Sequence, residues 1–292
     1  MKKQKLILLI GLFFSISSFK VNAQAPAYAW AIQSVGGADI FGSDIAVDKQ
    51  NNVVYSAGSF DEYEVGFGTG GSNYINSSNG SNDIFIAKTT TDGTPIWTKG
   101  FGGDGADQVT GIAVDGSGNV FIGGDYDSDT LNFGSFQLTN SSPGAAPFLA
   151  KLDANGNVLW AKNGVMSANS NLNYVGSKNV AVDAAGNVCY ASSIMGSLSF
   201  DGHTITCPTL GGGSMFVIKF DGSGNYLWTA VTQSLTTSLN PGVMIPEAIT
   251  FDKDNNCIAA GEYSGDNQIG GTQIPTSNDN YSDRVVTKIN GS

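Results

Sequence analysis

Carboxylates are the residues of this chain that could do chemistry, and they gather in two short stretches. GGDGADQVT (102–110) contains Asp104 and Asp107, and GGDYDSDT (123–130) adds three more aspartates. Paired carboxylates can serve as acid and base on a glycosidic bond, and carboxylate oxygens are ligands that Ca²⁺ prefers. Glycoside chemistry and calcium binding are therefore the two chemistries to weigh first.

Calcium binding has one partial match in the sequence. Residues 102–110 fit the G-G-x-G-x-D-x-U-x template of calcium-binding β-rolls, which makes Asp104 and Asp107 weak calcium candidates. Such sites draw ligands from successive tandem copies of the template, and the chain has one copy. Turns such as DANGN (153–157) also lack the bidentate Glu of an EF-hand loop. We therefore expect no metal site, and we interpret these aspartates as turn residues that bond their own backbone.

Catalysis of other kinds has little support. His203 is the only histidine, and no G-x-S-x-G sequence accompanies it, so a Ser-His-Asp triad lacks its parts. One His and three scattered Cys do not supply the ligand set of a zinc site. We predict a protein that is not an enzyme and needs no cofactor. The alternative is a carbohydrate-active hydrolase or lyase that uses the carboxylates.

The three cysteines do not form a disulfide framework. Cys189, Cys207 and Cys257 are an odd number, so at least one thiol is left over. Cys189 and Cys207 are close in sequence and could bridge. The other interpretation is that all three are small buried hydrophobic residues.

The N-terminus has the pattern of a secretory signal peptide over residues 1–23. A basic start, MKKQK, precedes an apolar run at 6–14, and Val21 and Ala23 place small residues before the cleavage site. The apolar run is too short to span a membrane comfortably. We therefore predict a folded domain at 24–292 that is secreted to the medium or the cell surface, with the periplasm as another possible destination.

The charge balance excludes some partners. The formal net charge is −11, from 14 basic and 25 acidic residues. An acidic surface has no basic patch for nucleic acid or for an anionic membrane. We predict no nucleic-acid partner and no membrane insertion, and we expect the partner to be a glycan or another extracellular protein.

An internal repeat positions these residues. One element recurs at 45–60, 111–126, 179–194 and 248–263, and its aspartates, 67, 68 and 69 residues apart, are Asp48, Asp115, Asp183 and Asp252. A second element recurs at 83–100, 148–164 and 216–232, with a partial copy at 284–292. Its tryptophans are Trp97, Trp160 and Trp228. A fixed period of this kind indicates a repeat architecture.

Each element has the pattern of a β-hairpin. Two short apolar runs flank a D-x-x-G-N or D-G turn, whose Gly and Asn tolerate positive φ. Two hairpins per repeat give four strands, a to d, which is one blade of a β-propeller. The segments between strands b and c are expected to form a small accessory hairpin in each blade, at 64–76, 130–140, 197–207 and 269–277.

The two ends of the chain complement each other. Residues 27–37, which contain Trp30, look like a strand d without its a, b and c, and the last repeat stops after strand c. We therefore predict an all-β, monomeric propeller of about four four-stranded blades, closed by the N-terminal strand in the last blade. The alternative is that these residues are the front of a longer propeller.

The pattern DIFIAK…DG…W…GG…GIAVD…GNV resembles the secreted bacterial β-propeller repeat, called the SBBP repeat, over essentially all of the predicted domain. The resemblance implies the propeller fold and says little about function, because such repeats occur mostly in uncharacterised exported proteins.

The links between repeats are the expected binding region. The d–a links differ strongly from copy to copy, and variable loops on a rigid scaffold usually carry binding. We predict a non-catalytic binding module, with an architectural segment of a larger surface protein as a further alternative. The expected binding residues are Asp104, Asp107, Asn171, Asn173, Tyr174, Met244 and Glu247.

Overall fold

The computed structural model describes a β-sheet protein. The described residues are 31, 34–61, 63–67, 73–77, 81–142, 144–168, 171–174, 179–207, 212–234, 242–274 and 282–291. The predicted signal peptide and Trp30 lie outside these ranges. Within them every regular element is a strand, and no helix is long and apolar enough to cross a membrane. Contacts divide the chain into Met1–Ala31 and Ile32–Ser292, and the following concerns the second unit.

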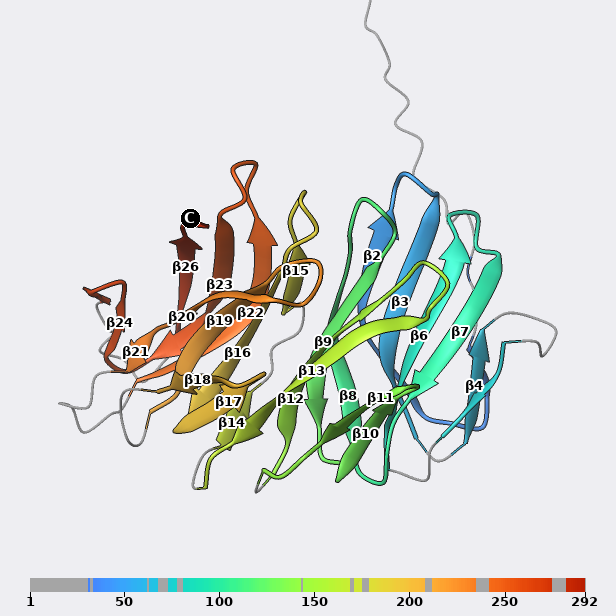
Figure 1. Ribbon diagram of the computed structural model, residues 1–292, viewed down its shortest axis with the longest axis horizontal. Coiled ribbons are helices and arrows are strands. Elements are labelled where there is room, and N and C mark those ends of the chain that lie inside the picture. Colours follow the sequence, from blue (N-terminus) through green and yellow to red (C-terminus); the bar gives the residue numbers. More distant parts are fainter. Residues whose placement is uncertain are drawn as a thin grey trace, which may run out of the picture. The chain divides into compact units, whose positions relative to one another are not determined.

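The first two predicted repeats each form an antiparallel sheet in the order a-b-c-d (Figure 1). Blade 1 contains β2 (Ile40–Asp48), β3 (Val53–Phe60), β6 (Asp83–Thr90) and β7 (Pro95–Phe101). Blade 2 contains β8 (Asp107–Val114), β9 (Val120–Tyr126), β12 (Ala146–Leu152) and β13 (Val158–Met166). The boundaries follow the predicted hairpins.

The third and fourth repeats depart from this pattern. Strand a of blade 3 is split into β14 (Asn171–Tyr174) and β15 (Val180–Val182), which are followed by β16 (Val188–Met195), β19 (Ser214–Phe220) and β20 (Tyr226–Val231). In the described residues blade 4 has three strands, β22 (Val243–Phe251), β23 (Cys257–Ser264) and β26 (Asp283–Ile289).

The predicted accessory hairpin is present between strands b and c of every blade. These hairpins are β4 (Glu64–Phe67) with β5 (Ile75–Asn76), β10 (Thr130–Phe133) with β11 (Phe136–Thr139), β17 (Ser197–Phe200) with β18 (His203–Thr206), and β24 (Asn267–Ile269) with β25 (Thr272–Ile274). The end of a preceding strand d pairs with the hairpin of the next blade, as Gly164 does with Phe200. The hairpins therefore link neighbouring blades.

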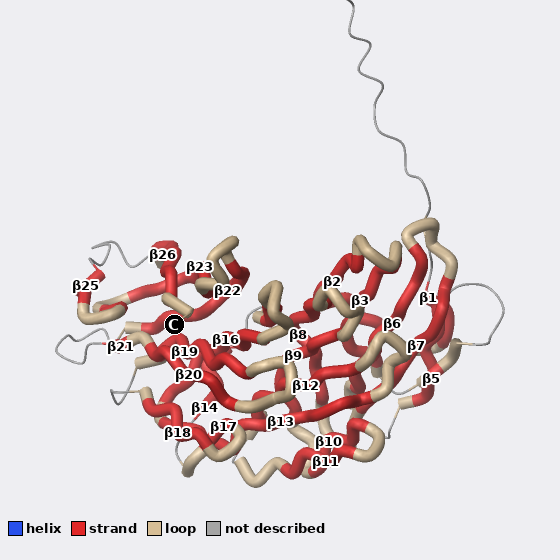
Figure 2. The backbone as a smooth tube through the Cα atoms, turned by 45° about the horizontal axis from the view of Figure 1, so that its top comes forward, coloured by secondary structure: helices blue, strands red, loops and turns tan. Residues whose placement is uncertain are grey.

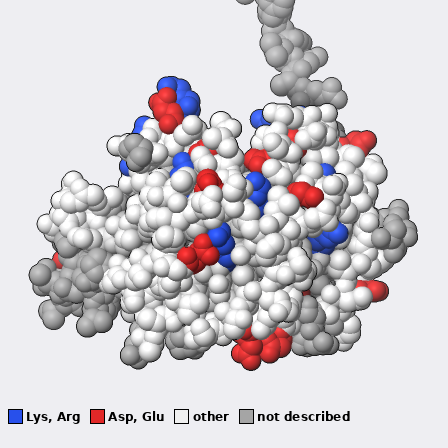
Figure 3. Space-filling model, viewed as in Figure 1, with Lys and Arg blue, Asp and Glu red and all other residues white. Residues whose placement is uncertain are grey.

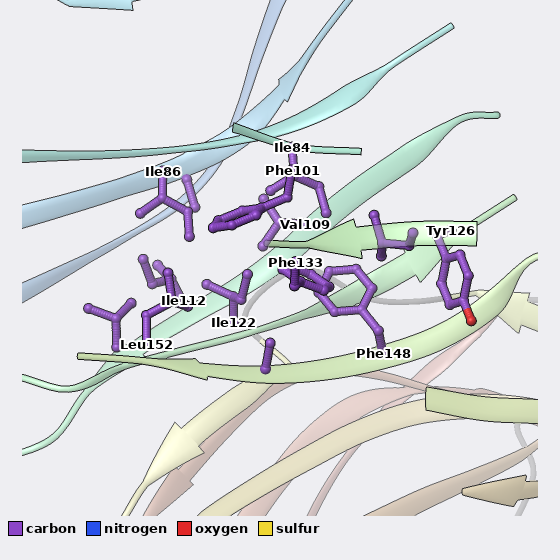
Figure 4. Packing of buried hydrophobic residues seen from close by; sticks show 14 of the residues in the cluster. Ile84, Ile86, Phe101, Val109, Ile112, Ile122, Tyr126, Phe133, Phe148 and Leu152 are labelled. Carbon is purple, nitrogen blue, oxygen red and sulfur yellow. The ribbon is translucent and has the colours of Figure 1, made fainter. Parts of the chain in front are cut away.

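Neighbouring sheets lie beside one another (Figure 2). Clusters of buried apolar side chains fill the space between them. One cluster joins Ile84, Ile86 and Phe101 of blade 1 to residues of blade 2 such as Ile122 and Phe148 (Figure 4). Strands β12 and β19 are buried at all their positions, because a sheet covers each of their two faces. A sheet buried on both faces shows a continuous apolar run instead of alternation, as these strands do.

The turns that join a to b and c to d are closed by their own side chains. Asp115 Oδ1 accepts hydrogen bonds from the backbone N–H groups of Ser117 and Asn119, both at 2.9 Å, and Asn119 Nδ2 donates to Asp115 Oδ2 at 2.8 Å. Asp153, Asp183, Asp221 and Asp252 repeat this arrangement. The carboxylates are occupied by turn hydrogen bonds, which agrees with their interpretation as structural residues.

A second repeated contact ties blade 1 to blade 2 and blade 2 to blade 3. Lys88 Nζ and Trp97 Nε1 in blade 1 donate to the carbonyl oxygen of Ala154 in blade 2, at 2.7 and 3.2 Å. Lys151 and Trp160 donate in the same way to Gly222 O in blade 3, at 2.8 and 3.4 Å. Trp97 and Trp160 therefore connect neighbouring blades.

The third interface lacks this contact. Trp228 Nε1 is buried and has no hydrogen-bond partner among the described residues. The acceptor in the first two interfaces is a carbonyl of the next c–d turn. No strand d pairs with β26 in the described part of blade 4.

The structure does not confirm the predicted four-bladed closure. Strand β1 (Ser34–Gly36) pairs with β4, and β26 has β23 as its one described partner. The outer faces of the first and last sheets are open: Ile45 is 64% exposed and Val286 is 72% exposed. A closed ring would cover both.

Candidate functional site

The two ends of each blade carry different connections. Strand antiparallelism places the a–b and c–d turns at one end, along the upper edge of Figure 1, and the b–c and d–a links at the other. We call these the turn end and the loop end. The turn end repeats with little change, whereas the loop end differs between blades.

Three blades share one irregularity near the loop end. Strand a has a bulge in blades 1, 2 and 4, between Gly42 and Asp44, Val109 and Gly111, and Pro246 and Ala248. The facing position in strand b is glycine each time. A Cβ on Gly58, Gly124 or Gly261 would lie 2.0, 1.9 or 2.2 Å from a carbonyl oxygen of the bulged strand. The bulge therefore requires a residue without a side chain.

Blade 3 breaks this rule. Tyr174 pairs with Ser193, and the next described pair is Val180 with Tyr190. Five residues separate the paired positions on strand a and two separate them on strand b, so the bulge has become an insertion. Ser192 occupies the position that is glycine in the other blades, and no described residue of strand a pairs with it.

Buried polar groups without partners gather at this break. Asn179 is 1% exposed, Ser192 and Ser193 are 0% exposed. The oxygen and nitrogen of the Asn179 amide and both serine hydroxyls have no hydrogen-bond partner among the described residues. An unmade hydrogen bond in the interior destabilises a protein by about 1–3 kcal/mol. Such groups in a native structure call for water or a ligand.

Blade 2 supplies the facing wall. Gly111 and Gly123 are register partners, and a Cβ on Gly111 would lie 2.5 Å from Asn179 Oδ1. A Cβ on Gly123 would lie 2.7 Å from the ring of Tyr190. The Tyr190 hydroxyl donates to Gly124 O at 3.2 Å. The two glycines thus let blade 3 approach closely beside its polar groups.

Asp125 adds a titratable group to this wall. It lies two residues after Gly123 in β9, so its side chain is on the same face of the blade 2 sheet as Gly123. This is the face that packs against Tyr190 of blade 3. Burial, and then repulsion by Asp127 and Asp107, raise the pKa of Asp125 to about 7. Burial, and then the Asp125 charge, raise the pKa of Tyr190 as well, and the neighbouring Ser192 hydroxyl opposes this rise. We call Asp125, Asn179, Tyr190, Ser192 and Ser193 the blade 3 polar cluster.

The predicted calcium candidates serve the b–c crossover of blade 2. Asp104 Oδ1 accepts from the backbone N–H of Asp129 at 2.9 Å, and Asp107 Oδ2 accepts from Ser128 Oγ at 2.8 Å. Asp107 is 0% exposed, and burial, opposed by Ser128 and increased by the Asp83 charge, raises its pKa to about 6. The described residues contain no group of three or more His, Cys, Asp or Glu placed to hold a metal ion.

The two perturbed carboxyls do not face each other. Asp107 pairs directly with Tyr126, so these two share one face of the sheet. Asp125 precedes Tyr126 and points to the opposite face, since side chains alternate along a strand. The sheet of blade 2 lies between Asp107 and Asp125, and they do not form a two-carboxylate site.

The other predicted binding residues have mixed placements. Met244 is 0% exposed in the apolar cluster between blades 3 and 4, so it is a core residue and the expectation that it stands over the loops is wrong. Glu247 is exposed and accepts from Arg284 Nη1 at 2.6 Å. Asn171, Asn173 and Tyr174 belong to strand β14 and not to a loop, because this part of the link pairs with β16.

His203 and the surface acids lie elsewhere. The His203 ring stacks on Tyr226, with centroids 3.7 Å apart. Acidic side chains gather at the lower edge of Figure 3, where Figure 1 draws the lower ends of β8 and β10. Asp104, Asp127 and Asp129 are exposed residues of this region.

Sequence reasoning found the blade 3 link but missed the residues behind it. Asn179, Ser192 and Ser193 lie inside the repeat that was interpreted as scaffold. The signal was available in the repeat columns: Ser192 stands where three copies have Gly, and Asn179 where the others have Asp44, Gly111 and Ala248.

Comparison with known proteins agrees with the repeat. Residues 96–129, which span β7, β8 and β9, match the family model of the SBBP beta-propeller repeat. An uncharacterised WD repeat-containing protein of Acanthamoeba polyphaga mimivirus is 25% identical over 225 residues, or 65% of this chain. The match spans 15% of that protein's length. The family match covers one repeat, and it agrees with the β-propeller-like repeats that the observed sheets form.

Proposed function

We propose that this chain is an exported, non-catalytic binding module that recognises a glycan or an extracellular protein through the loop end of blade 3. The similarity to propeller-repeat and WD repeat-containing proteins supports a repeat-based interaction module. The observation that carries the proposal is the blade 3 polar cluster, where buried donors and acceptors without partners coincide with the one break in the repeat.

The chemistry of the cluster fits a polyhydroxylated or amide-bearing ligand. Asn179 offers an amide donor and acceptor, and two serine hydroxyls can do either. Binding sites commonly combine an apolar or aromatic wall with a few placed polar groups, and Tyr190 supplies such a wall here. A ligand group or an ordered water at this position would satisfy groups that the protein leaves unpaired.

A glycan array compared across variants tests this proposal. Asn179→Ala introduces the alanine that blade 4 has at the equivalent position, Ala248. Ser192→Gly introduces the glycine that the other three blades have at the equivalent position. We expect the wild type to retain a class of oligosaccharide and the double variant to lose it, with both proteins melting at similar temperatures. Asp44 is the blade 1 equivalent of Asn179, and its carboxylate accepts a hydrogen bond from Ile112 N. Asp44→Ala should leave glycan binding intact. Retention of the same glycans by the double variant would contradict the assignment.

A carboxylate-based glycoside hydrolase or lyase remains the second candidate. Its support is the raised pKa of Asp107, about 6, and of Asp125, about 7, both near the loop end. Their positions on opposite faces favour binding instead. Mass spectrometry of retained glycans separates the two: shortened products that disappear in Asp125→Asn would indicate the enzyme, and intact glycans would indicate the binding module.

We also propose that residues 27–33 complete the last blade. The support is a register match: Ser34 lies four residues after Trp30 and pairs with Phe67, as Gly164 lies four residues after Trp160 and pairs with Phe200. This match supports a strand d register for the segment before β1, and no described strand pairs with the second edge of β26.

Light scattering and thermal melting of the wild type and Trp30→Ala test the closure. We expect a monomer with one cooperative melt, and a clear loss of melting temperature in the variant. An unchanged melt in Trp30→Ala would contradict closure. A dimer that depends on Trp30 would instead indicate exchange between chains.

A further inference from the structure

Two cysteines from neighbouring blades meet in the interior. Cys189 on β16 of blade 3 and Cys257 on β23 of blade 4 are each 0% exposed and belong to one apolar cluster. Both side chains face the space between the sheets of blades 3 and 4. They lie 68 residues apart in the sequence, so the contact joins two distant segments.

The repeat fixes this contact. Cys189 pairs with Lys219 as Phe121 pairs with Lys151 and Tyr55 with Lys88, so these three residues are equivalent. The partner positions in the following blade are Val120, Val188 and Cys257. The blade 1–2 cluster contains Tyr55 with Val120, and the blade 2–3 cluster contains Phe121 with Val188. In the third interface both members of this pair are cysteines.

The pairing expected from sequence distance is not the one that the fold brings together. Cys207 follows β18, and its Sγ lies 3.0 Å from Ser214 Oγ and 3.6 Å from Gly212 O, both in hydrogen-bonding contact. No disulfide joins any of the three cysteines in this structure. Proximity in space therefore favours a disulfide between Cys189 and Cys257 over one that includes Cys207.

We propose that Cys189 and Cys257 form a disulfide that joins strands b of blades 3 and 4 when the chain matures in an oxidising compartment. The occurrence of this bond in the cell rests on the export proposed above. The oxidant is a protein or small-molecule disulfide. One S–S bond forms in the chain, and the S–S bond of the oxidant breaks. The oxidant takes up the two protons and two electrons of the Cys189 and Cys257 thiols and is released as two thiols.

The reaction should occur before the blades close. The thiolate is the attacking species. Burial, and then the hydrogen bond from Cys257, raise the pKa of Cys189, so the folded protein holds little thiolate. The bond would therefore form during folding and then become inaccessible to reductants.

The location gives the bond a clear role. The blade 3–4 interface is the one in which the tryptophan Nε1 has no acceptor among the described residues, whereas the first two interfaces have that hydrogen bond. The cluster there is also built from small residues such as Ala191 and Ala259. A covalent link would join two sheets whose interface lacks this tryptophan hydrogen bond among the described residues.

Oxidative refolding of the full chain tests the proposal. The chain is unfolded in urea, refolded in a reduced–oxidised glutathione buffer, denatured and treated with N-ethylmaleimide, and its mass is measured. We expect no adduct on Cys207→Ala and one adduct on the wild type. Cys189→Ala and Cys257→Ala are the matched controls, and each should carry two adducts. Because Cys189 and Cys207 share one tryptic peptide, 179–219, the linked peptide is identified in the Cys207→Ala variant.

Stability supplies a second measurement that is independent of ligand binding. Oxidised Cys207→Ala should melt on the order of 5–10 °C above its reduced form, as expected for a bond that closes a long loop. Cys189→Ala/Cys207→Ala should show no such difference. Two adducts on a natively refolded Cys207→Ala, or a wild-type bridge that includes Cys207, would overturn the proposal. Neither result bears on the glycan array, so the two proposals can fail separately.

Discussion

The pKa values of Asp183 at the turn end and of Asp125 at the loop end are shifted in opposite directions. At the turn end, burial alone would raise the pKa of Asp183, but hydrogen bonds from Asn187 and Lys219 hold it below its usual value. At the loop end burial prevails, and the pKa of Asp125 rises to about 7. The difference lies in the hydrogen-bond donors. Asp183 accepts from two backbone N–H groups and from the Asn187 amide, whereas burial and the charges of Asp127 and Asp107 act on Asp125.

This difference separates scaffold from site. A carboxylate that is fully bonded stabilises one conformation and has nothing left to offer a ligand. Polar groups that are buried and unbonded, such as Asn179 and Ser192, lower stability and are kept in functional regions where a partner completes them. Substitutions at the two ends should therefore have opposite effects on stability.

Removal of a turn-end carboxylate should give the largest effect. Asp183 and Lys219 form a 3.0 Å ion pair with side chains 1% and 3% exposed. Asp183→Ala leaves the Lys219 ammonium buried without its partner, and we expect a loss of about 3–5 kcal/mol in the free energy of unfolding by urea denaturation. Asp252→Ala is the matched control, because its partner Lys288 is 50% exposed, and it should lose much less. Equal losses would contradict the burial argument.

The contribution of the Asp125 carboxyl to stability should change with pH in the opposite direction to that of the turn-end carboxyls. A pKa of about 7 in the folded state, above the unfolded value near 3.9, means that the folded protein holds the proton more tightly. Stability should therefore fall as the pH rises from about 4 to about 7, while the lowered turn-end carboxyls lose their contribution only as the pH falls below about 4.

Asp125→Asn isolates this contribution. At pH 8 the variant should be more stable than the wild type by about 1–2 kcal/mol, since each unit of pKa displacement corresponds to about 1.4 kcal/mol and partial exposure reduces the total. The difference should shrink as the pH falls and disappear below about pH 4, where Asp125 is protonated in both the folded and the unfolded state. A variant that follows the wild-type pH profile would show that Asp125 is not the group responsible.

The tryptophans sharpen the comparison along the turn end. Trp97→Phe and Trp160→Phe each remove a hydrogen bond to a turn carbonyl, and we expect losses of about 0.5–1.5 kcal/mol beyond the change in packing. Trp228→Phe removes a buried N–H without a described acceptor, so its loss should be smaller. Equal losses at all three positions would mean that the third interface holds an acceptor in solution.

The serine at the break should give the smallest effect. Ser192→Ala removes an unbonded buried hydroxyl, and the stability should be unchanged or raised by up to about 1 kcal/mol in urea denaturation. Thr232 is a suitable control, because its Oγ1 accepts from Met215 N at 3.0 Å and it is also buried. Thr232→Val should be destabilising, and a comparable loss in Ser192→Ala would contradict its unbonded state.

The repeat made the fold predictable, but residues of the candidate site lie inside the repeated element and could not be told apart from scaffold residues. Regular Asp and Trp spacing predicted the hairpins, the accessory hairpins and the order of strands in each sheet, because these depend on local turn chemistry and alternation. Asn179 and Ser192 could not be recognised in the same way, since their state depends on how strand a of blade 3 pairs. The Cys189–Cys257 contact likewise depends on the packing of one sheet on the next, which sequence distance does not report.

Hydrogen–deuterium exchange of the full chain, with and without a glycan retained on the array, tests whether the loop end of blade 3 is the binding site. We expect the ligand to protect the loop end of blade 3 and the facing strand of blade 2, at 171–174, 188–195 and 120–126, and to leave the turns at 48–52, 115–119 and 183–187 unchanged. Protection confined to the turns, or to the acidic crossover at 102–107 and 127–130, would contradict it.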